Sequence, residues 1–389
     1  MHRFFKRYTK ESTKPSSITS PPPINFLTHP NRLNNSGQQS LVGPASSFVN
    51  AIYYPNWHIY KQRPPSSLNL QFITHIFYAF AWVKLDGTVY LSDEYADTQI
   101  PLAGGTRGCL RALFDLKLQY PHLKLILSIG GGGAGSQNFP SAASTKECRA
   151  RFVESAKTFC NEYGFDGIDI DWETPSELET ATSYLQLIKC LQPHFSILTS
   201  ALPAGTWALQ NLPLLEIIPL LTFLNLMTYD FSGPWTSLSG HHAQLFSPSQ
   251  PHSADAKLSC ASAIEYLISR DVPANKILMG IPCYGRSFLG VTGPGQRYTG
   301  HGGDEGTFEM RDLPLLNSWE QIDPEVCATI CVSPESGWVS YDSPETVSRK
   351  AKWARENGIG GLFYWTGSGD RDAGQGSLVE AGWRAYRTP

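Results

Sequence analysis

Eight short runs of apolar residues recur along the chain, and each has about the length of one buried β-strand. Continuous apolar runs are typical of parallel strands that are covered on both faces. Polar stretches separate them, so the pattern predicts a strand at each run. The runs are Val49–Tyr54, Ile73–Trp82, Leu123–Ile129, Phe165–Asp171, Phe195–Leu202, Thr222–Thr228, Lys276–Cys283 and Gly358–Trp365.

Several of the stretches between these runs have the periodicity of helices. In Cys148–Tyr163, apolar residues recur at Phe152, Ala156 and Phe159. Helices are also predicted at Glu177–Leu191, at Ser259–Arg270 and at Pro344–Asn357, which is followed by a helix-stopping glycine. Strands that alternate with helices predict an α/β fold. Eight repeats favour a closed (β/α)8 TIM barrel over a doubly wound open sheet.

Two stretches depart from this alternation. Residues 1–47 are rich in Ser, Thr, Pro and Asn, which favours a disordered leader. The stretch after the seventh strand is rich in Gly, Pro and turns and is too long for a simple connection. We therefore expect a small α+β insertion at residues 289–339, rather than a floppy excursion. The barrel would then comprise residues 48–288 and 340–389.

Composition narrows the class of protein. The chain has 389 residues, of which 41% are hydrophobic and 17% charged, as in soluble globular proteins. The net charge of −3 gives no reason to expect a nucleic-acid partner, and no apolar run is long enough to span a membrane. We expect a monomer.

The leader lacks the apolar stretch of about 7–15 residues that a secretory signal needs. A cytoplasmic location or unconventional secretion is therefore expected, with an extracellular location as the alternative; an organelle transit peptide is a weaker one. The eight cysteines lack paired zinc spacing, and most of them are expected to be free buried thiols. Cys327 and Cys331 would form a local bridge only in an oxidising compartment.

The fourth apolar run ends in an acidic motif, Phe-Asp-Gly-Ile-Asp-Ile-Asp-Trp-Glu, at residues 165–173. Side chains alternate between the faces of a strand, so Asp169, Asp171 and Glu173 share one face at steps of roughly 6–7 Å. Like charges at this spacing raise one another's pKa and favour a site that holds a proton near neutral pH. A divalent-cation site is a weaker alternative, because the motif lacks the Gly-turn loop of a calcium site.

Polar and aromatic residues also follow the other strands. Because active sites of such barrels lie at the carboxyl ends of the strands, these residues are expected to converge on one cavity. They stand in Tyr53–Trp57, Ser128–Gly131, Met227–Phe231, Tyr284–Arg286 and Tyr364–Trp365.

With these motifs the chain resembles glycoside hydrolase family 18, the chitinases and their relatives, from about Val49 to about Asp370. The acidic motif matches the family's D-x-x-D-x-D-x-E signature, and Ser128–Gly131 matches its S-x-G-G motif. Met227–Asp230, Tyr284–Arg286 and the final Trp365 also fit. Among subgroups the chain is most similar to fungal class V chitinases, with a shortened insertion.

The resemblance implies a chitinase that cleaves β-1,4 linkages between N-acetylglucosamine residues by a retaining, substrate-assisted mechanism. Glu173 would be the general acid and base. Asp171 would orient the acetamide and stabilise the positive intermediate, and Asp169 would share a proton with Asp171. Asp166, on the opposite parity, is expected to be structural. No metal or organic cofactor is implied, because the substrate supplies the nucleophile.

The remaining implied roles concern substrate binding. Tyr229 would hydrogen-bond the acetamide carbonyl, Asp230 would bind and distort the sugar, and Trp365 would form the floor. Further contacts are expected from Tyr53, Phe80, Met227, Trp235 and Arg286.

Several of these residues have a structural alternative. Tyr53, Phe80 and Met227 also suit barrel packing, and Arg286 also suits a structural ion pair. Ser128 is expected to support the acids by hydrogen bonding. Trp57 and Trp207 are read as surface or core aromatics. The adjacent His241 and His242 do not face one way and are read as loop residues.

One departure from the family concerns Gly132. Many active chitinases carry an aromatic residue directly after S-x-G-G, and its absence predicts a preference for soluble or short substrates. An endo-β-N-acetylglucosaminidase acting on N-glycans is an alternative function. A catalytically inactive chitin-binding lectin is another, against which the presence of Glu173 argues.

Overall fold

The computed structural model describes residues 48–388, so the predicted leader lies outside the described part of the chain. Eight parallel strands form one sheet, and β1 pairs with both β14 and β2, which closes the sheet into a barrel. Each predicted run overlaps one of these strands, and the (β/α)8 barrel is confirmed. The strands are β1 (Val49–Pro55), β2 (His75–Val83), β4 (Lys124–Gly130), β5 (Gly167–Asp171), β6 (Ile197–Pro203), β7 (Phe223–Met227), β8 (Ile277–Pro282) and β14 (Gly361–Trp365). A short strand, β3 (Val89–Leu91), adds antiparallel to β2.

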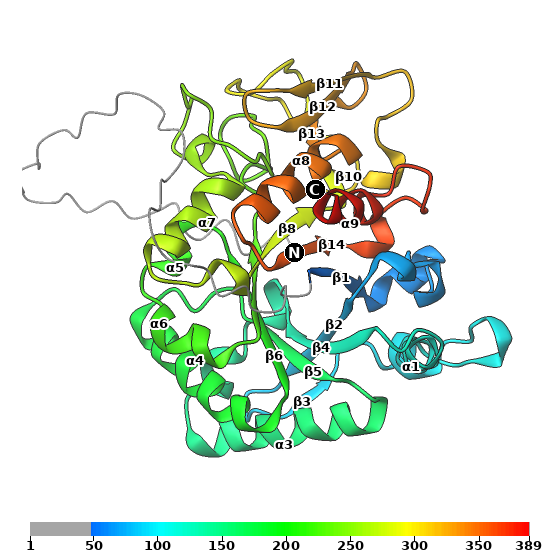
Figure 1. Ribbon diagram of the computed structural model, residues 1–389, viewed down its shortest axis with the longest axis vertical. Coiled ribbons are helices and arrows are strands. Elements are labelled where there is room, and N and C mark those ends of the chain that lie inside the picture. Colours follow the sequence, from blue (N-terminus) through cyan, green and yellow to red (C-terminus); the bar gives the residue numbers. More distant parts are fainter. Residues whose placement is uncertain (1–47, 389) are drawn as a thin grey trace, which may run out of the picture. The chain divides into compact units, whose positions relative to one another are not determined.

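Helices lie outside the barrel strands (Figure 1). The four predicted helices agree with the observed ones within two residues at each end. The helix α3 starts before its predicted first residue because the Thr145 side chain caps it by accepting from the N–H of Cys148. The helices are α1 (Cys109–Gln119), α2 (Phe139–Ala142), α3 (Lys146–Tyr163), α4 (Leu178–Leu191), α5 (Thr206–Leu209), α6 (Leu214–Ile217), α7 (Cys260–Ser269), α8 (Pro344–Glu356) and α9 (Leu378–Arg387).

The core has two layers that follow the two-residue period of the strands. In β1, Ala51 and Tyr53 pack inside the barrel with Phe77 and Phe363, whereas Ile52 and Tyr54 belong to the larger cluster under the helices. This alternation decides which side chains of each strand reach the interior of the barrel.

After β8 the chain forms a second, antiparallel sheet, drawn above the barrel in Figure 1. Its order is β10-β9-β13-β12-β11. The strand of this sheet that comes first in the chain, β9, falls in the range predicted for the barrel. Within residues 289–339 the structure has strands and a 3-10 turn at Met310–Asp312. The predicted domain boundaries stay a prediction. The strands are β9 (Tyr284–Phe288), β10 (Thr307–Glu309), β11 (Trp319–Asp323), β12 (Ala328–Ser333) and β13 (Gly337–Tyr341).

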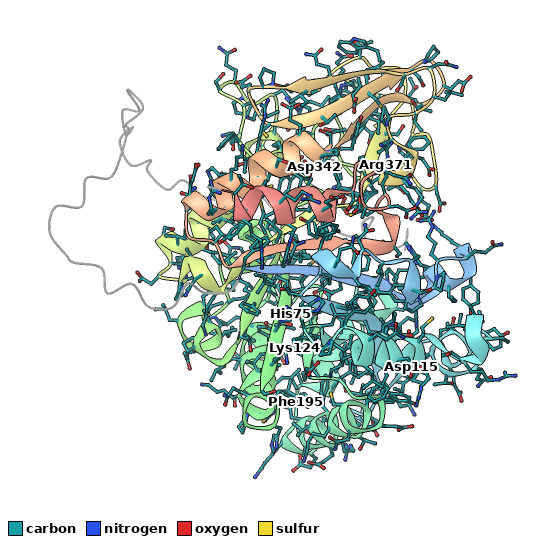
Figure 2. The ribbon with its side chains drawn as sticks, turned by 45° about the vertical axis from the view of Figure 1, so that its right-hand side comes forward. His75, Asp115, Lys124, Phe195, Asp342 and Arg371 are labelled. Carbon is teal, nitrogen blue, oxygen red and sulfur yellow. The ribbon has the colours of Figure 1, made fainter. Side chains whose placement is uncertain are left out.

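Figure 2 labels residues of the barrel and of the chain around the second sheet. His75 and Lys124 begin β2 and β4 at the amino ends of the barrel strands, and Asp342 lies directly after the last strand of the second sheet. Arg371 donates from its guanidinium to the carbonyl of Leu313, which ties the chain after β14 to that sheet.

Two further expectations meet the structure here. All eight cysteines are free thiols, so no bridge joins Cys327 to Cys331. Within residues 48–388, no helix has the length and apolar character needed to cross a bilayer.

Candidate active site

The strand β5 carries the acidic motif to the carboxyl end of the barrel. Ile168, Ile170 and Trp172 pack in the outer cluster, so Asp169 and Asp171 point to the interior, where both are buried. Glu173 follows two residues beyond and is exposed. Asp166 lies at the opposite end, where it pairs with Lys117 (2.8 Å), as expected of a structural residue.

Asp169 is held by four donors. The hydroxyls of Tyr53 and Ser128 donate to Oδ2 at 2.8 and 2.7 Å. The hydroxyl of Thr199 donates to Oδ1 at 2.7 Å, and the side-chain amide of Asn225 donates to the same oxygen at 3.4 Å. Burial raises the pKa of Asp169, and the hydrogen bonds oppose that rise. The supporting role of Ser128 is confirmed. Sequence analysis missed the donors Thr199 and Asn225, although each is a polar residue inside an apolar strand.

Asp171 is the least satisfied of the acids. Its Oδ1 is buried without a hydrogen-bond partner, and no hydrogen bond joins its carboxyl to Asp169. Burial raises the pKa of Asp171 well above its usual value, and the charges of Glu173 and Asp169 raise it further. The shared proton stays a prediction, while the free oxygen is a spare acceptor for a ligand.

Glu173 is placed by its backbone. Its N–H donates to the hydroxyl of Ser136 at 2.7 Å, and that hydroxyl in turn donates to the carbonyl of Gly131 at 2.8 Å. Sequence analysis did not single out Ser136. Crowding by surrounding protein atoms, followed by the charge of Asp230, raises the pKa of Glu173 to about 7. Because the residue is open to solvent in the free protein, we expect the rise to develop fully only when a ligand displaces water.

Asp230 is clamped from the neighbouring sheet. Arg286 donates from Nε to Oδ1 (2.9 Å) and from Nη2 to Oδ2 (2.7 Å), and the Tyr284 hydroxyl donates to Oδ1 (2.7 Å). Burial acts to raise the pKa of Asp230, but Arg286 and the hydrogen bonds outweigh it and hold that pKa far below its usual range. Arg286 therefore makes an ion pair with Asp230, as its structural alternative expects, and its contact with substrate stays a prediction.

Aromatic rings gather beside the acids. Trp365 stacks on Phe80 with ring centroids 5.7 Å apart, and the ring of Trp57 lies 6.1 Å from Phe80 and 6.3 Å from Trp365. Trp57, expected to be a surface or core aromatic, is 36% exposed and lies beside the predicted floor. The ring of Tyr53 lies 5.6 Å from Trp365 and is 1% exposed, and its hydroxyl donates to Asp169, so its contact with a sugar stays a prediction.

Residues from β7 and the loop after it complete the group. Met227 and Tyr229 are half-buried and pack against the inner cluster, and Tyr229 meets the edge of Tyr284 at 6.4 Å. Trp235 is 37% exposed, with the Arg286 guanidinium 4.7 Å above its ring. The structure therefore brings every predicted site residue to this end of the barrel, while the roles assigned to them stay predictions.

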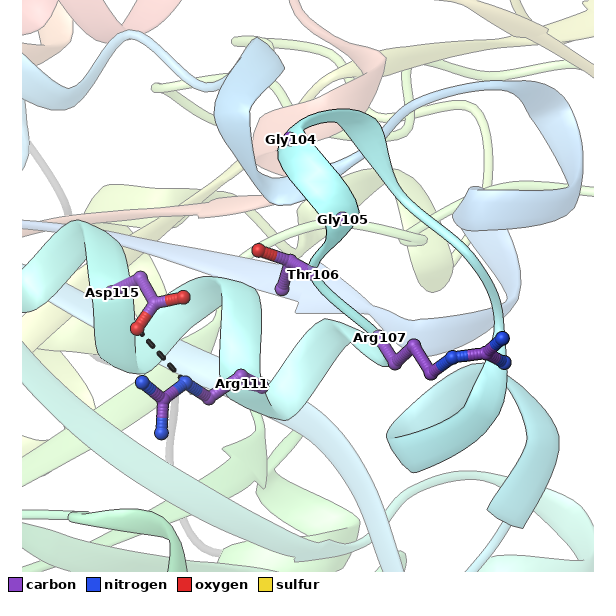
Figure 3. A pocket seen from close by; sticks show the side chains of 6 residues that line it. All are labelled: Gly104, Gly105, Thr106, Arg107, Arg111 and Asp115. Carbon is purple, nitrogen blue, oxygen red and sulfur yellow. Dashed lines mark ion pairs between the residues drawn. The ribbon is translucent and has the colours of Figure 1, made fainter.

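A separate surface hollow of about 480 Å³ lies away from the acids, at the start of α1 (Figure 3). Arg111 and Asp115 form an ion pair of 2.9 Å at its edge. The predicted site residues do not line it. Among residues 48–388, no cluster of three or more His, Cys, Asp or Glu side chains is arranged to hold a metal ion.

The motifs and the barrel can now be set beside known proteins. Residues 49–370 match the family described as glycosyl hydrolases family 18. The chain belongs to this family. Chitinase 1 of Aphanocladium album is 35% identical, with 88% of this chain and 86% of the relative covered. Endochitinase 1 of Metarhizium robertsii is 33% identical, with 86% and 84% covered.

A solved structure agrees. The family 18 chitinase of Cycas revoluta, in complex with (GlcNAc)3, has a TM-score of 0.75 and 26% identity, and the match covers 86% of this chain and 99% of that one. The protein is therefore a glycoside hydrolase, as the resemblance implied.

Proposed function

We propose that the protein is a chitinase that hydrolyses β-1,4 linkages between N-acetylglucosamine residues by a retaining, substrate-assisted mechanism, with Glu173 as acid and base. The observation that carries this proposal is the pair Asp171 and Glu173, two carboxyls with raised pKa at one strand end beside an aromatic floor. The names of the relatives, chitinase and endochitinase, support the substrate.

The other two acids are poorly suited to be nucleophiles. Both carboxylate oxygens of Asp169 accept hydrogen bonds from neighbouring side chains, and the Asp169 side chain is fully buried. Asp230 is neutralised by the two-point contact with Arg286. A neighbouring carbonyl oxygen of the substrate, from its own N-acetyl group, fits this arrangement better than a protein carboxylate.

The proposed reaction has two steps. Glu173 gives its proton to the glycosidic oxygen as that bond breaks, and the acetamide oxygen bonds to the anomeric carbon, forming an oxazolinium ion. Ionised Glu173 then takes a proton from water, whose oxygen displaces the acetamide at the same carbon. The configuration is retained, and Glu173 regains its proton.

The neighbours of Glu173 serve the intermediate. The partnerless Oδ1 of Asp171 accepts the acetamide N–H and opposes the positive charge of the ring. The hydroxyl of Tyr229 donates to the acetamide carbonyl. Trp365 supports the apolar face of the sugar, because flat aromatic rings pack against such faces without losing hydrogen bonds.

The test is hydrolysis of N-acetylglucosamine oligomers by the protein and by Glu173→Gln, which keeps the shape of the side chain and removes its titratable proton. We expect the variant to lose about 10²- to 10⁴-fold in kcat, and NMR of the fresh product to show the β-anomer. Glu154→Gln, on the exposed face of α3, is the matched control and should be fully active.

Other outcomes would redirect the proposal. An active Glu173→Gln variant, or a fresh product in the α-form, would contradict the acid assignment or the retaining route. Oligomers that bind without being cleaved would point to a lectin. Release of glycans from a glycoprotein, with chitin oligomers left intact, would favour the endo-β-N-acetylglucosaminidase.

A further inference from the structure

His242 lies in the loop between β7 and α7, with its ring fully buried. Its Nδ1 is 3.5 Å from Oδ1 of Asp230, and its ring centroid is 5.2 Å from that of Tyr284. Its backbone carbonyl accepts from the N–H of Phe231 at 3.0 Å. Both the backbone and the ring of this histidine therefore meet the chain at Asp230 or directly after it.

The ring is unusual in its hydrogen bonding. Neither Nδ1 nor Nε2 has a hydrogen-bond partner of good geometry, although both are buried. Buried polar atoms without partners are rare in folded proteins and call for a reason other than stability. Burial lowers the pKa of His242, and the nearby Arg286 charge acts in the same direction, so the ring is neutral and carries one N–H.

The two carboxylate oxygens of Asp230 have different hydrogen-bond partners. Oδ1 accepts from Tyr284 and from Nε of Arg286, and it faces His242. Within the described residues, Oδ2 accepts from Nη2 of Arg286 alone. A carboxylate oxygen has two lone-pair sites, so Oδ2 keeps one acceptor position for a substrate hydroxyl.

We propose that His242 is a positioning residue for Asp230: the long contact of 3.5 Å from its Nδ1–H, together with its buried ring, keeps Oδ1 beside Tyr284 and Arg286, so that Oδ2 remains directed to the substrate. This inference rests on the proposed function, in which Asp230 binds and distorts the sugar. The second nitrogen, Nε2, is then an acceptor without a hydrogen-bond partner, because a neutral imidazole that donates from Nδ1 carries no proton on Nε2.

The same contact bears on pH dependence through Glu173. The groups that face Asp230 are His242, Tyr284, Arg286, Glu173 and Tyr229. Those that face His242 are Asp230, Tyr284, Arg286 and Asp342, and Asp342 is itself paired with Lys350 at 2.6 Å. Because the charge of Asp230 raises the pKa of Glu173, an Asp230 carboxylate that moves away from Glu173 raises that pKa less, and Glu173 then loses its proton at lower pH.

Two variants separate hydrogen bonding from packing. His242→Phe keeps a ring of similar size and removes both nitrogens, whereas His242→Asn is smaller and keeps an N–H donor near the Nδ1 position. We expect His242→Phe to lose about tenfold in kcat/KM on N-acetylglucosamine oligomers, since small misplacements of a substrate-binding group carry losses of this order. Its alkaline limb of activity should move to lower pH, and His242→Asn should recover most of the activity.

His241→Phe is the matched control. His241 is nearly as buried, but its Nδ1 contacts the Ser340 hydroxyl (3.0 Å) and its ring packs on Trp338 (5.0 Å), away from the acids. This variant should melt earlier, with the pH profile unmoved. A His242→Phe variant with wild-type kinetics, or a His242→Asn variant more impaired than His242→Phe, would overturn the proposal.

A measurement on the unmodified protein covers the case in which a variant does not fold. Long-range ¹H–¹⁵N NMR of its histidine rings should show His242 neutral with the proton on Nδ1. A proton on Nε2 would overturn the proposal, because Nδ1 would then have nothing to donate. Failure of the proposed function would look different, since the unmodified protein would leave the oligomers intact while the NMR result stood.

Discussion

Asp169, Asp171 and Glu173 stand two residues apart on one strand, yet their neighbours make them chemically different groups. Asp169 is surrounded by donors, Asp171 has a buried oxygen without a partner, and Glu173 is open to solvent. Environment rather than residue type therefore separates a supporting acid, a partner for the intermediate and a proton donor.

The pKa of Glu173 predicts a pH profile. A general acid acts while it holds its proton, so kcat, which reports the ligand-bound enzyme, should fall as pH rises through the folded-state pKa of about 7. An unperturbed glutamate would give that fall near its ordinary value of about 4.3. The measurement is kcat on a short soluble oligomer from pH 4 to 9, and an alkaline limb of kcat centred near pH 4–5 would contradict the raised pKa.

Replacing the neighbouring charge should move this limb. Asp230→Asn removes the carboxylate that raises the pKa of Glu173 and leaves the positive charge of Arg286 unpaired. Both changes favour ionised Glu173, so the alkaline limb should shift to lower pH, with reduced activity throughout. Asp115→Asn, which breaks an exposed ion pair on α1, is the control and should leave the limb in place; a shift upward in Asp230→Asn would refute the argument.

At the scale of an element, the glycine-rich turn after β4 decides how close the backbones approach the acids. Gly130 has φ of +122°, and a Cβ there would lie 2.1 Å from the carbonyl oxygen of Asp171. Gly133 also has a positive φ, +64°, but faces open space. The first position therefore requires glycine for both conformation and space, and the second for conformation alone.

This difference gives a paired prediction. Gly130→Ala should destabilise the fold by about 3–5 kcal/mol, because strain and a backbone clash combine. Gly133→Ala should cost only about 1–2 kcal/mol, the usual penalty of an L-residue in the left-handed region. Urea unfolding of the two variants measures both values, and equal losses would show that the contact with Asp171 is not what fixes Gly130.

Gly132, in the same turn, bears on substrate length. Its φ is ordinary (−62°), and a Cβ there would lie 3.3 Å from Oε2 of Glu173, so a side chain would stand beside the acid. Gly132→Trp should supply the missing stacking surface and lower KM for long oligomers about fivefold, the worth of one aromatic contact. Gly132→Ala places the same Cβ without the ring. If both variants behave alike, the missing ring does not explain the predicted preference for short substrates.

At the scale of the whole described molecule, a buried ion pair joins the second sheet to the barrel. Lys350, on α8, is 0% exposed and binds Asp342, 1% exposed, at 2.6 Å; its Nζ also donates to the carbonyl of Ala243 in the loop after β7. One cation thus connects the end of β13, a barrel helix and the loop that carries His242.

Breaking this pair should be costly. Lys350→Met leaves Asp342 as an uncompensated buried charge, so unfolding free energy should fall by about 3–5 kcal/mol. The double variant Lys350→Met with Asp342→Leu removes both charges and should recover a large part of the loss. Urea denaturation at pH 7 compares them, and a single variant as stable as the unmodified protein would contradict the assignment. The expected monomeric state and the expected cellular location of the protein stay predictions.

The sequence by itself determined the barrel and the position of its acids. Eight apolar runs with helical spacers carry the α/β repeat, and the two-residue period of a strand places Asp169 and Asp171 on one face whatever surrounds them. These features are local in the chain, which is why pattern and motif were sufficient to find them.

Only the tertiary structure decided how those acids are supported. Thr199 and Asn225 reach Asp169 from two other strands, Ser136 fixes the backbone of Glu173 from a turn, and His242 meets Asp230 from the far end of a loop. Each contact joins residues distant in sequence, so no local pattern encodes it. Burial and donor geometry, which set the pKa of each carboxyl, exist only once the chain has folded.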